Sequence, residues 1–140
     1  MNPLYVRTII VCIGALFSII AIVLRAIMNN SDRCQKRLED FRQQVNDMLQ
    51  EDEEVLAICG YNPCAAVTNK RLLITRRAGV DVVAFSQITK LKGTSYNGQR
   101  VDEPGQMQTF QIKAEKNYYL RYQDEGFPSV VNELFRRVHL

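Results

Sequence analysis

The sequence predicts an α+β protein with an N-terminal transmembrane helix, an amphipathic helix, a bent antiparallel sheet or barrel of seven strands, and a capping C-terminal helix. Three observations predict this class. An uncharged apolar run near the N-terminus is long enough to span a bilayer. The apolar residues then change from helical to extended spacing near residue 54 and return to helical spacing after Pro128. We therefore divide the chain into residues 1–30, 31–53 and 54–140.

The apolar run covers residues 8–24, carries no charged side chain, and is flanked by Arg7 and Arg25. As a helix it would reach about 25 Å, and apolar neighbours on both sides extend it towards the roughly 30 Å of a hydrocarbon core. The two arginines can place their guanidinium groups among the headgroups. The run is therefore interpreted as a single membrane span.

Two other interpretations compete with a membrane span. A cleaved signal peptide needs a small-x-small site, whereas residues 25–30 read Arg-Ala-Ile-Met-Asn-Asn. A buried core helix seldom consists of such a long unbroken apolar run at a terminus. We therefore expect the span to remain attached to the protein.

Basic residues flanking the span predict its orientation. Arg7 and the terminal amine precede it, and a larger group follows within about 20 residues. We expect the N-terminus outside and the remaining chain in the cytoplasm, in a single-pass protein of the cell membrane. The basic residues that follow the span are Arg25, Arg33, Lys36, Arg37 and Arg42.

Charge and cysteine content limit the function classes. The net charge of +3 comes partly from the arginines beside the span, so the remaining part is close to neutral, unlike most nucleic-acid-binding domains. Cys59 and Cys64 flank a turn sequence and could face each other across a hairpin, as thiols in a reducing cytoplasm. One such pair with a distant His139 supplies too few ligands for a metal site. We expect neither a metal nor another cofactor.

An amphipathic helix is predicted from Arg33 to about Glu51. Polar residues at positions 29–32 break the apolar run and include good N-cap residues, so we expect a new helix to start there. Its narrow apolar stripe is typical of a face that packs on the following domain. The acidic run at residues 51–54 is interpreted as a solvated loop that ends the helix. The stripe consists of Leu38, Phe41, Val45, Met48 and Leu49.

Short apolar segments separated by turn residues predict the sheet. A longer exposed loop is expected over residues 97–106, and Pro128 suits the start of the last helix, whose apolar face can close an open end of the sheet. The seven predicted strands are Val55–Cys59, Ala65–Thr68, Leu72–Thr75, Val80–Phe85, Ile88–Tyr96, Phe110–Ala114 and Tyr118–Tyr122.

Two segments carry a resemblance to a known family. Residues 66–74, Ala-Val-Thr-Asn-Lys-Arg-Leu-Leu-Ile, resemble the "LTNKRL" hairpin of bacterial PH-like domains, which are YokE-like and related to GRAM domains. Residues 85–91, Phe-Ser-Gln-Ile-Thr-Lys-Leu, are similar to the segment that follows this hairpin, although Phe85 stands where a proline is common. The resemblance covers roughly residues 33–138 and implies a pleckstrin-homology-like fold.

The hairpin also has a physical interpretation of its own. Asn69 can adopt the left-handed conformation that a tight turn needs, while Leu72 and Ile74 point inwards and Leu73 and Thr75 point the other way. The preferred interpretation of the segment Thr-Asn-Lys-Arg is therefore a structural turn, and a binding site is the less favoured alternative.

The resemblance implies ligand binding through basic residues near the strand ends. In eukaryotic members of this superfold the basic residues of the first interstrand loop bind phosphoinositides, but here residues 59–64 contain no Lys or Arg. Phosphoinositide binding is therefore not expected. The remaining candidates for ligand or lipid contact are Lys70, Arg71, Arg76, Arg77, Lys90 and Lys92.

These features favour a non-catalytic binding or scaffold module at the cytoplasmic membrane face, acting on a protein partner or on lipid headgroups. The single histidine lies next to the last residue, and the sequence has no Gly-rich phosphate loop or nucleophile elbow, so we do not expect an enzyme. The alternative is a structural subunit that oligomerises through its helices. Its packing residues would be Gly14, Ala15 and Ser18, which form a small-residue pattern in the span.

Overall fold

A computed structural model describes residues 2–60, 63–122 and 126–140. The structure is α+β, as predicted: a long N-terminal helix, two antiparallel sheets and a C-terminal helix. Two compact units divide the chain, one ending at Lys36 and the other running from Arg37 to Leu140.

The helix α1 runs without interruption from Pro3 to Met48. Its N-terminal part is apolar and long enough to cross a membrane, and that stretch is not buried by the rest of the described chain. The predicted break at residues 29–32 is wrong. Asn, Ser and Asp each cost only a few tenths of a kcal/mol in an exposed helix, and helix is already nucleated on both sides of them. Good cap residues therefore did not mark a boundary.

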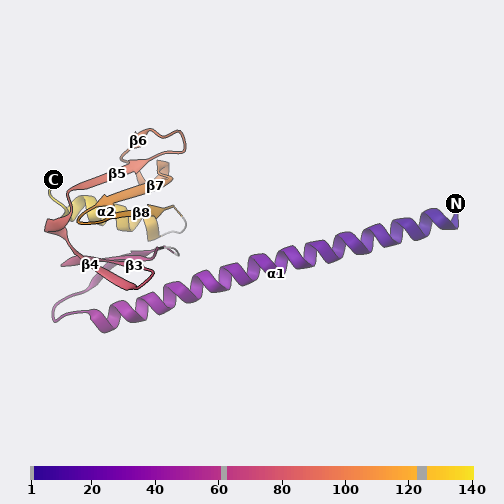
Figure 1. The fold of residues 1–140 in the computed structure, drawn as a ribbon, viewed down its shortest axis with the longest axis horizontal. Coiled ribbons are helices and arrows are strands. Elements are labelled where there is room, and N and C mark those ends of the chain that lie inside the picture. Colours follow the sequence, from indigo (N-terminus) through magenta and orange to yellow (C-terminus); the bar gives the residue numbers. More distant parts are fainter. Residues whose placement is uncertain (1, 61–62, 123–125) are drawn as a thin grey trace. The chain divides into compact units, whose positions relative to one another are not determined.

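The second unit holds two four-stranded antiparallel sheets (Figure 1). Sheet A has the strand order β1-β2-β3-β4, and sheet B has the order β6-β5-β7-β8. The strands of sheet A are Val55–Cys59, Ala65–Thr68, Arg71–Arg76 and Gly79–Ala84. The strands β5 to β8 of sheet B are Lys90–Thr94, Arg100–Val101, Thr109–Lys113 and Asn117–Arg121.

The prediction of seven strands in one bent sheet or barrel is corrected by the structure, which has eight strands in two sheets among the described residues. A 3-10 turn, η1 (Phe85–Gln87), lies where β4 ends and separates the two sheets. The strand expected from Ile88 to Tyr96 is shorter and covers Lys90–Thr94. The predicted loop over residues 97–106 contains β6 and a second 3-10 turn, η2 (Pro104–Gln106). A two-residue strand leaves no detectable alternation in the sequence, so β6 was missed.

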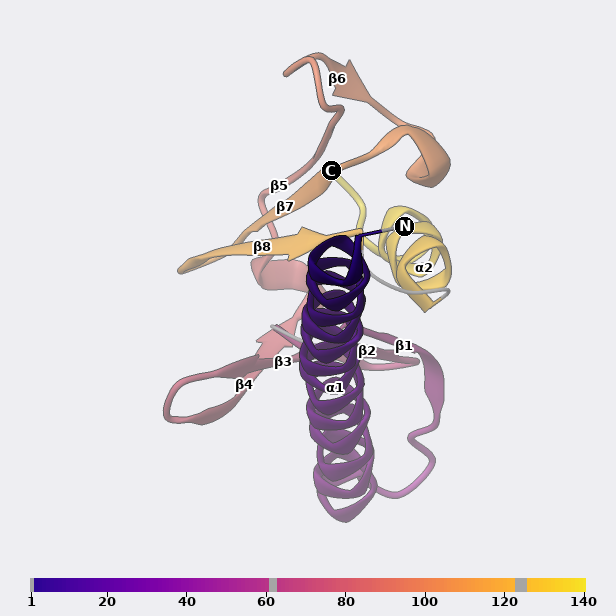
Figure 2. The same cartoon turned by 90° about the vertical axis from the view of Figure 1, so that its right-hand side faces the viewer.

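One core joins both sheets to the helix α2 (Gly126–Arg137). Figure 2 shows α2 beside β1 and β2, and its buried apolar residues belong to the same cluster as Leu72 and Ile74 of sheet A and Phe110 and Ile112 of sheet B. The predicted packing of the apolar face of this helix on the strands is confirmed. These buried residues of α2 are Phe127, Val130, Val131 and Leu134.

A smaller cluster covers the opposite face of sheet A. Phe41 and Val45, near the end of α1, are buried against Leu73 and Ala66. The stripe predicted as a packing face therefore packs on the sheet, and the inward direction of Leu72 and Ile74 against the outward direction of Leu73 is confirmed. The middle of sheet A is therefore buried on both faces, which explains why every residue of β2 is buried.

Candidate functional site

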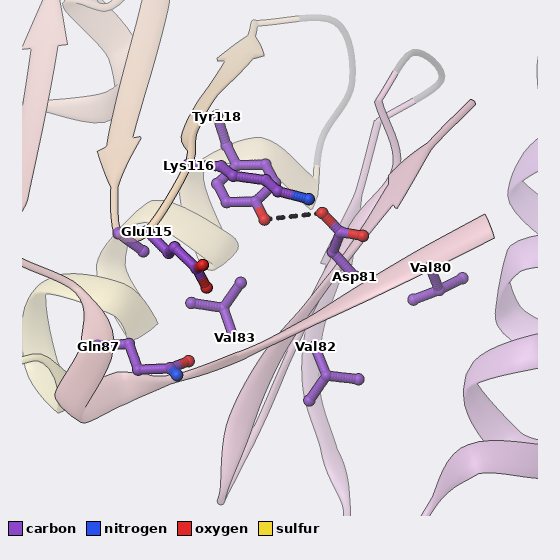
Figure 3. Close-up of a pocket in the computed structure, with 9 residues that line it drawn as sticks. Val80, Asp81, Val82, Val83, Gln87, Glu115, Lys116 and Tyr118 are labelled. Carbon is purple, nitrogen blue, oxygen red and sulfur yellow. Dashed lines mark hydrogen bonds between the residues drawn. The ribbon is translucent and has the colours of Figure 1, made fainter. Parts of the chain in front are cut away.

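The strongest candidate site is a small polar pocket between β4 and the β7–β8 turn (Figure 3). Its volume is about 260 Å³. The pocket lies along β4, which is an edge strand of sheet A, and faces residues of sheet B. The lining residues are Val80, Asp81, Val82, Val83, Gln87, Ala114, Glu115, Lys116 and Tyr118.

A hydrogen bond between the two sheets forms the centre of this pocket. The Tyr118 hydroxyl of β8 donates to Oδ2 of Asp81 in β4 at 2.8 Å, as Figure 3 shows. Asp81 also faces the Arg76 guanidinium at 3.5 Å, and that guanidinium lies 5.9 Å from the centre of the Tyr118 ring. Arg76, Asp81 and Tyr118 thus form one group, the Asp81–Tyr118 latch, that connects sheet A with sheet B.

The phenol in this latch stays protonated at ordinary pH. Burial, the hydrogen bond to Asp81 and the negative charge of Asp81 raise the pKa of Tyr118 to about 12, against a smaller opposing effect of Arg76. A phenol with so high a pKa is a hydrogen-bond donor and a poor general base. Its chemistry is therefore positional: it fixes the carboxylate of Asp81.

A larger and more open hollow adjoins the pocket. It has a volume of about 540 Å³ and shares Asp81, Lys116 and Tyr118 with the first pocket. Arg76, Arg77 and Tyr119 line it as well. The pair of hollows therefore combines three cations with two carboxylates, Asp81 and Glu115, and Asp81 is already engaged by Arg76 and Tyr118.

The six basic residues named from the sequence lie in three separate places. Arg76 and Arg77 lie at the β3–β4 turn beside the pocket. Lys90 and Lys92 belong to β5 of sheet B. Lys70 and Arg71 lie at the β2–β3 turn, where Lys70 Nζ donates to the carbonyl of Glu51 at 2.8 Å. The structure brings together Arg76 and Arg77 with Lys116, which sequence reasoning did not include.

Arg71 is held in a buried ion pair. Its Nε donates to Glu53 Oε2 at 3.0 Å, its Nη2 donates to the carbonyl of Met48 at 2.8 Å, and the carboxylate of Glu53 has no exposure to solvent. Thr68 adds a hydroxyl donor to the same oxygen at 2.7 Å. The interpretation of residues 51–54 as a solvated loop is therefore wrong for Glu53, because a cation and a hydroxyl compensate its burial.

The pKa of Glu53 is lowered by this group. Burial acts to raise it, but hydrogen bonds from the backbone of Gln50, from Arg71 and from Thr68, together with the charge of Arg71, outweigh the burial. The carboxylate therefore remains ionised at neutral pH and holds Arg71, whose Nη2 ties the end of α1 to the β2–β3 turn by its bond to the carbonyl of Met48.

The β2–β3 turn is built differently from the expectation. Asn69 does not adopt a left-handed conformation, since Asp52 is the non-glycine residue with positive φ among those described. The hydroxyl of Thr68 accepts the backbone N–H groups of Lys70 and Arg71, both at 3.1 Å, and so closes the turn. The amide of Asn69 instead bonds to the backbone of Asp52 and Glu54. The side chains of Thr68 and Asn69 therefore stabilise this turn and its contact with residues 52–54.

The two cysteines of the first hairpin do not face each other. Cys59 pairs with Ala65 across the strands and belongs to the main core, whereas Cys64 belongs to the cluster beneath α1. Tyr61 and Asn62 of the intervening turn lie outside the described residues. Within the described part of the chain, no three His, Cys, Asp or Glu side chains are grouped so that they could hold a metal ion.

Gly14, Ala15 and Ser18 lie on the exposed apolar part of α1. The Ser18 hydroxyl donates to the carbonyl of Gly14 at 3.0 Å, within the same helix. An added Cβ at Gly14 would meet open space. The pattern is therefore accessible on one helix face, and its hydroxyl is bonded internally.

Sequence reasoning missed Asp81 and Tyr118. The sequence offers two signals for them: Asp81 is a charged residue within the apolar residues 80–83, and Tyr118 is the first buried residue in the alternating pattern of β8. The two residues are 37 positions apart and belong to different sheets, so their contact becomes visible only with the fold. No family model, no curated protein and no solved structure matches this chain.

Proposed function

We propose that this protein is a single-pass membrane protein that holds a PH-like, non-catalytic binding module at the cytoplasmic membrane face. The observation that carries the proposal is the exposed apolar part of α1, whose large side chains have no covering from the described chain. Phe17 is 68% exposed and Ile22 is 67% exposed. Exposing so much apolar surface to water would be very unfavourable in free energy, whereas contact with lipid tails removes that surface from water.

The PH-like part of the proposal rests on architecture and on the hairpin motif. Two four-stranded antiparallel sheets share a core with one C-terminal helix, and the Thr-Asn-Lys-Arg turn links β2 and β3. The non-catalytic role is supported by two carboxylates that are already engaged in ion pairs and hydrogen bonds. Glu53 is engaged by Arg71, and Asp81 is engaged by Arg76 and Tyr118, so these carboxylates act in structure rather than in proton transfer.

Anchoring and orientation can be tested with the protein's own cysteines. Cys34 follows the apolar stretch, Cys12 lies inside it, and Cys59 and Cys64 are buried. If the domain is cytoplasmic, a membrane-impermeant maleimide will label Cys34 only after the cells are opened. The Asn2→Cys variant is the matched control and should be labelled in intact cells.

Two results would contradict the proposal. Recovery of the protein in the supernatant after alkaline carbonate extraction of membranes would exclude a spanning anchor. Labelling of Cys34 in intact cells, together with protection of a cysteine at position 2, would reverse the orientation and place the domain outside.

A further inference from the structure

The outer face of sheet B carries five cations and no carboxylate. Residues that pair directly across antiparallel strands share a face, so the register identifies each outward position. The face consists of three rows: Lys90–Lys113–Asn117, Lys92–Gln111–Tyr119, and Arg100–Thr94–Thr109–Arg121. The residues between them, such as Leu91, Phe110 and Ile112, are buried in the core.

These cations are not used to stabilise the described part of the chain. No ion pair among the described residues includes Lys90, Lys92, Lys113, Arg100 or Arg121. Lys90 and Lys113 even lie directly opposite each other, and like charges in this position destabilise a sheet. An unfavourable arrangement of this kind indicates a partner that neutralises it.

The shape of the face favours a flat anionic partner. Small ligands need concave sites, whereas the three rows lie on a sheet surface. Of the residues in these rows, only Asn117 and Tyr119 line one of the described hollows, and both lie on the edge strand β8. Tyr119 is 52% exposed among the cations, and tyrosine is typical of the boundary between headgroups and water. A plane of lipid phosphates matches both the charge and the flatness.

We infer that the outer face of sheet B binds anionic phospholipid headgroups of the membrane in which α1 is anchored. This inference rests on the proposed anchoring, which keeps the face close to a bilayer so that weak contacts suffice. Each Lys or Arg close to an anionic leaflet raises the association constant roughly fivefold, and salt weakens this attraction by screening it.

The test is lysine footprinting of the full chain in lipid nanodiscs. One set of discs contains phosphatidylcholine alone, and the other also contains phosphatidylglycerol. The acetylation rate of each lysine is measured by mass spectrometry. We expect Lys90, Lys92 and Lys113 to react several-fold more slowly in the anionic discs, with the difference lost at high salt, while Lys70 at the β2–β3 turn reacts equally in both.

A charge-reversed variant sharpens the test. Lys92→Glu in the middle of the face should remove the protection of Lys90 and Lys113, whereas the matched variant Lys70→Glu should leave it intact. Equal rates for the face lysines in both kinds of disc would overturn the inference. So would protection seen in native membranes or with added RNA but absent from anionic discs, which would assign the face to a protein or nucleic-acid partner.

Failure of the anchoring proposal has a different signature. A chain that does not enter nanodiscs contradicts the membrane anchor, and the same lysines are then measured with the chain added to preformed anionic vesicles. Slower acetylation of the face lysines with anionic vesicles than with neutral vesicles supports lipid binding by this face without the anchor. Equal acetylation rates with both kinds of vesicle reject lipid binding by the face as well.

Discussion

At the scale of single residues, the buried pair of Glu53 and Arg71 is the most consequential feature. The carboxylate has no solvent exposure and accepts bonds from Arg71, Thr68 and the backbone of Gln50. Removing its charge leaves the guanidinium of Arg71 without its counterion in a partly buried place. We expect Glu53→Gln to lower the free energy of unfolding by about 2 kcal/mol, measured by denaturant unfolding. Glu51→Gln, at an exposed position, is the control.

The same pair gives stability a dependence on acid. Because the pKa of Glu53 is lower in the folded chain than its ordinary value of 4.5, its contribution is fully present above pH 4.5 and is lost as the pH falls through the folded pKa. The decline below pH 4.5 should be shallower in Glu53→Gln than in the unmodified protein. Parallel pH profiles of the two proteins would contradict this role of Glu53.

Tyr118 has the opposite dependence, on alkali. Its pKa of about 12 lies above the ordinary value of 10.0, so the stability it contributes is complete below pH 10 and is lost as the pH rises towards 12. Ultraviolet titration of Tyr118→Phe should lack the phenolate step near pH 12 that the unmodified protein shows. The substitution should also cost about 1 kcal/mol, because one hydrogen bond between the sheets is lost. Tyr119→Phe, exposed on sheet B, should retain the step.

At the scale of elements, the contact of α2 with β1 depends on Gly126. A Cβ at this position would collide with the backbone carbonyl of Ile58, which cannot move aside as a flexible side chain can. We expect Gly126→Ala to push the start of α2 away from β1 and to lower the free energy of unfolding by about 1–3 kcal/mol. Gly105→Ala, where a Cβ would meet open space, should leave the unfolding midpoint unchanged.

At the scale of the whole molecule, the periodicity of apolar residues predicted which helices and strands exist. It predicted less well where they begin and end and how the strands pair. Alternation located seven strands and both helical faces because burial on one side imposes a period of 2 or 3.6. The two-residue β6 has too few residues to show a period, and the 3-10 turn at Phe85–Gln87 divides the sheets without a Gly or Pro signal. The Asp81–Tyr118 latch and the pair of Glu53 with Arg71 depend on contacts between distant segments, which a single sequence does not encode locally.

The division of the chain into two compact units predicts which truncated forms will fold. The compact unit begins at Arg37, inside the continuous helix α1, because Phe41 and Val45 belong to the core beneath sheet A. A chain that starts at Arg37 should therefore unfold at the same temperature as the full protein in detergent. A chain that starts at Glu51 loses both residues and exposes Leu73, and each lost core residue costs about 2–5 kcal/mol. It should melt far lower or aggregate. Equal melting temperatures for both truncated chains would show that the end of α1 does not belong to the folded domain.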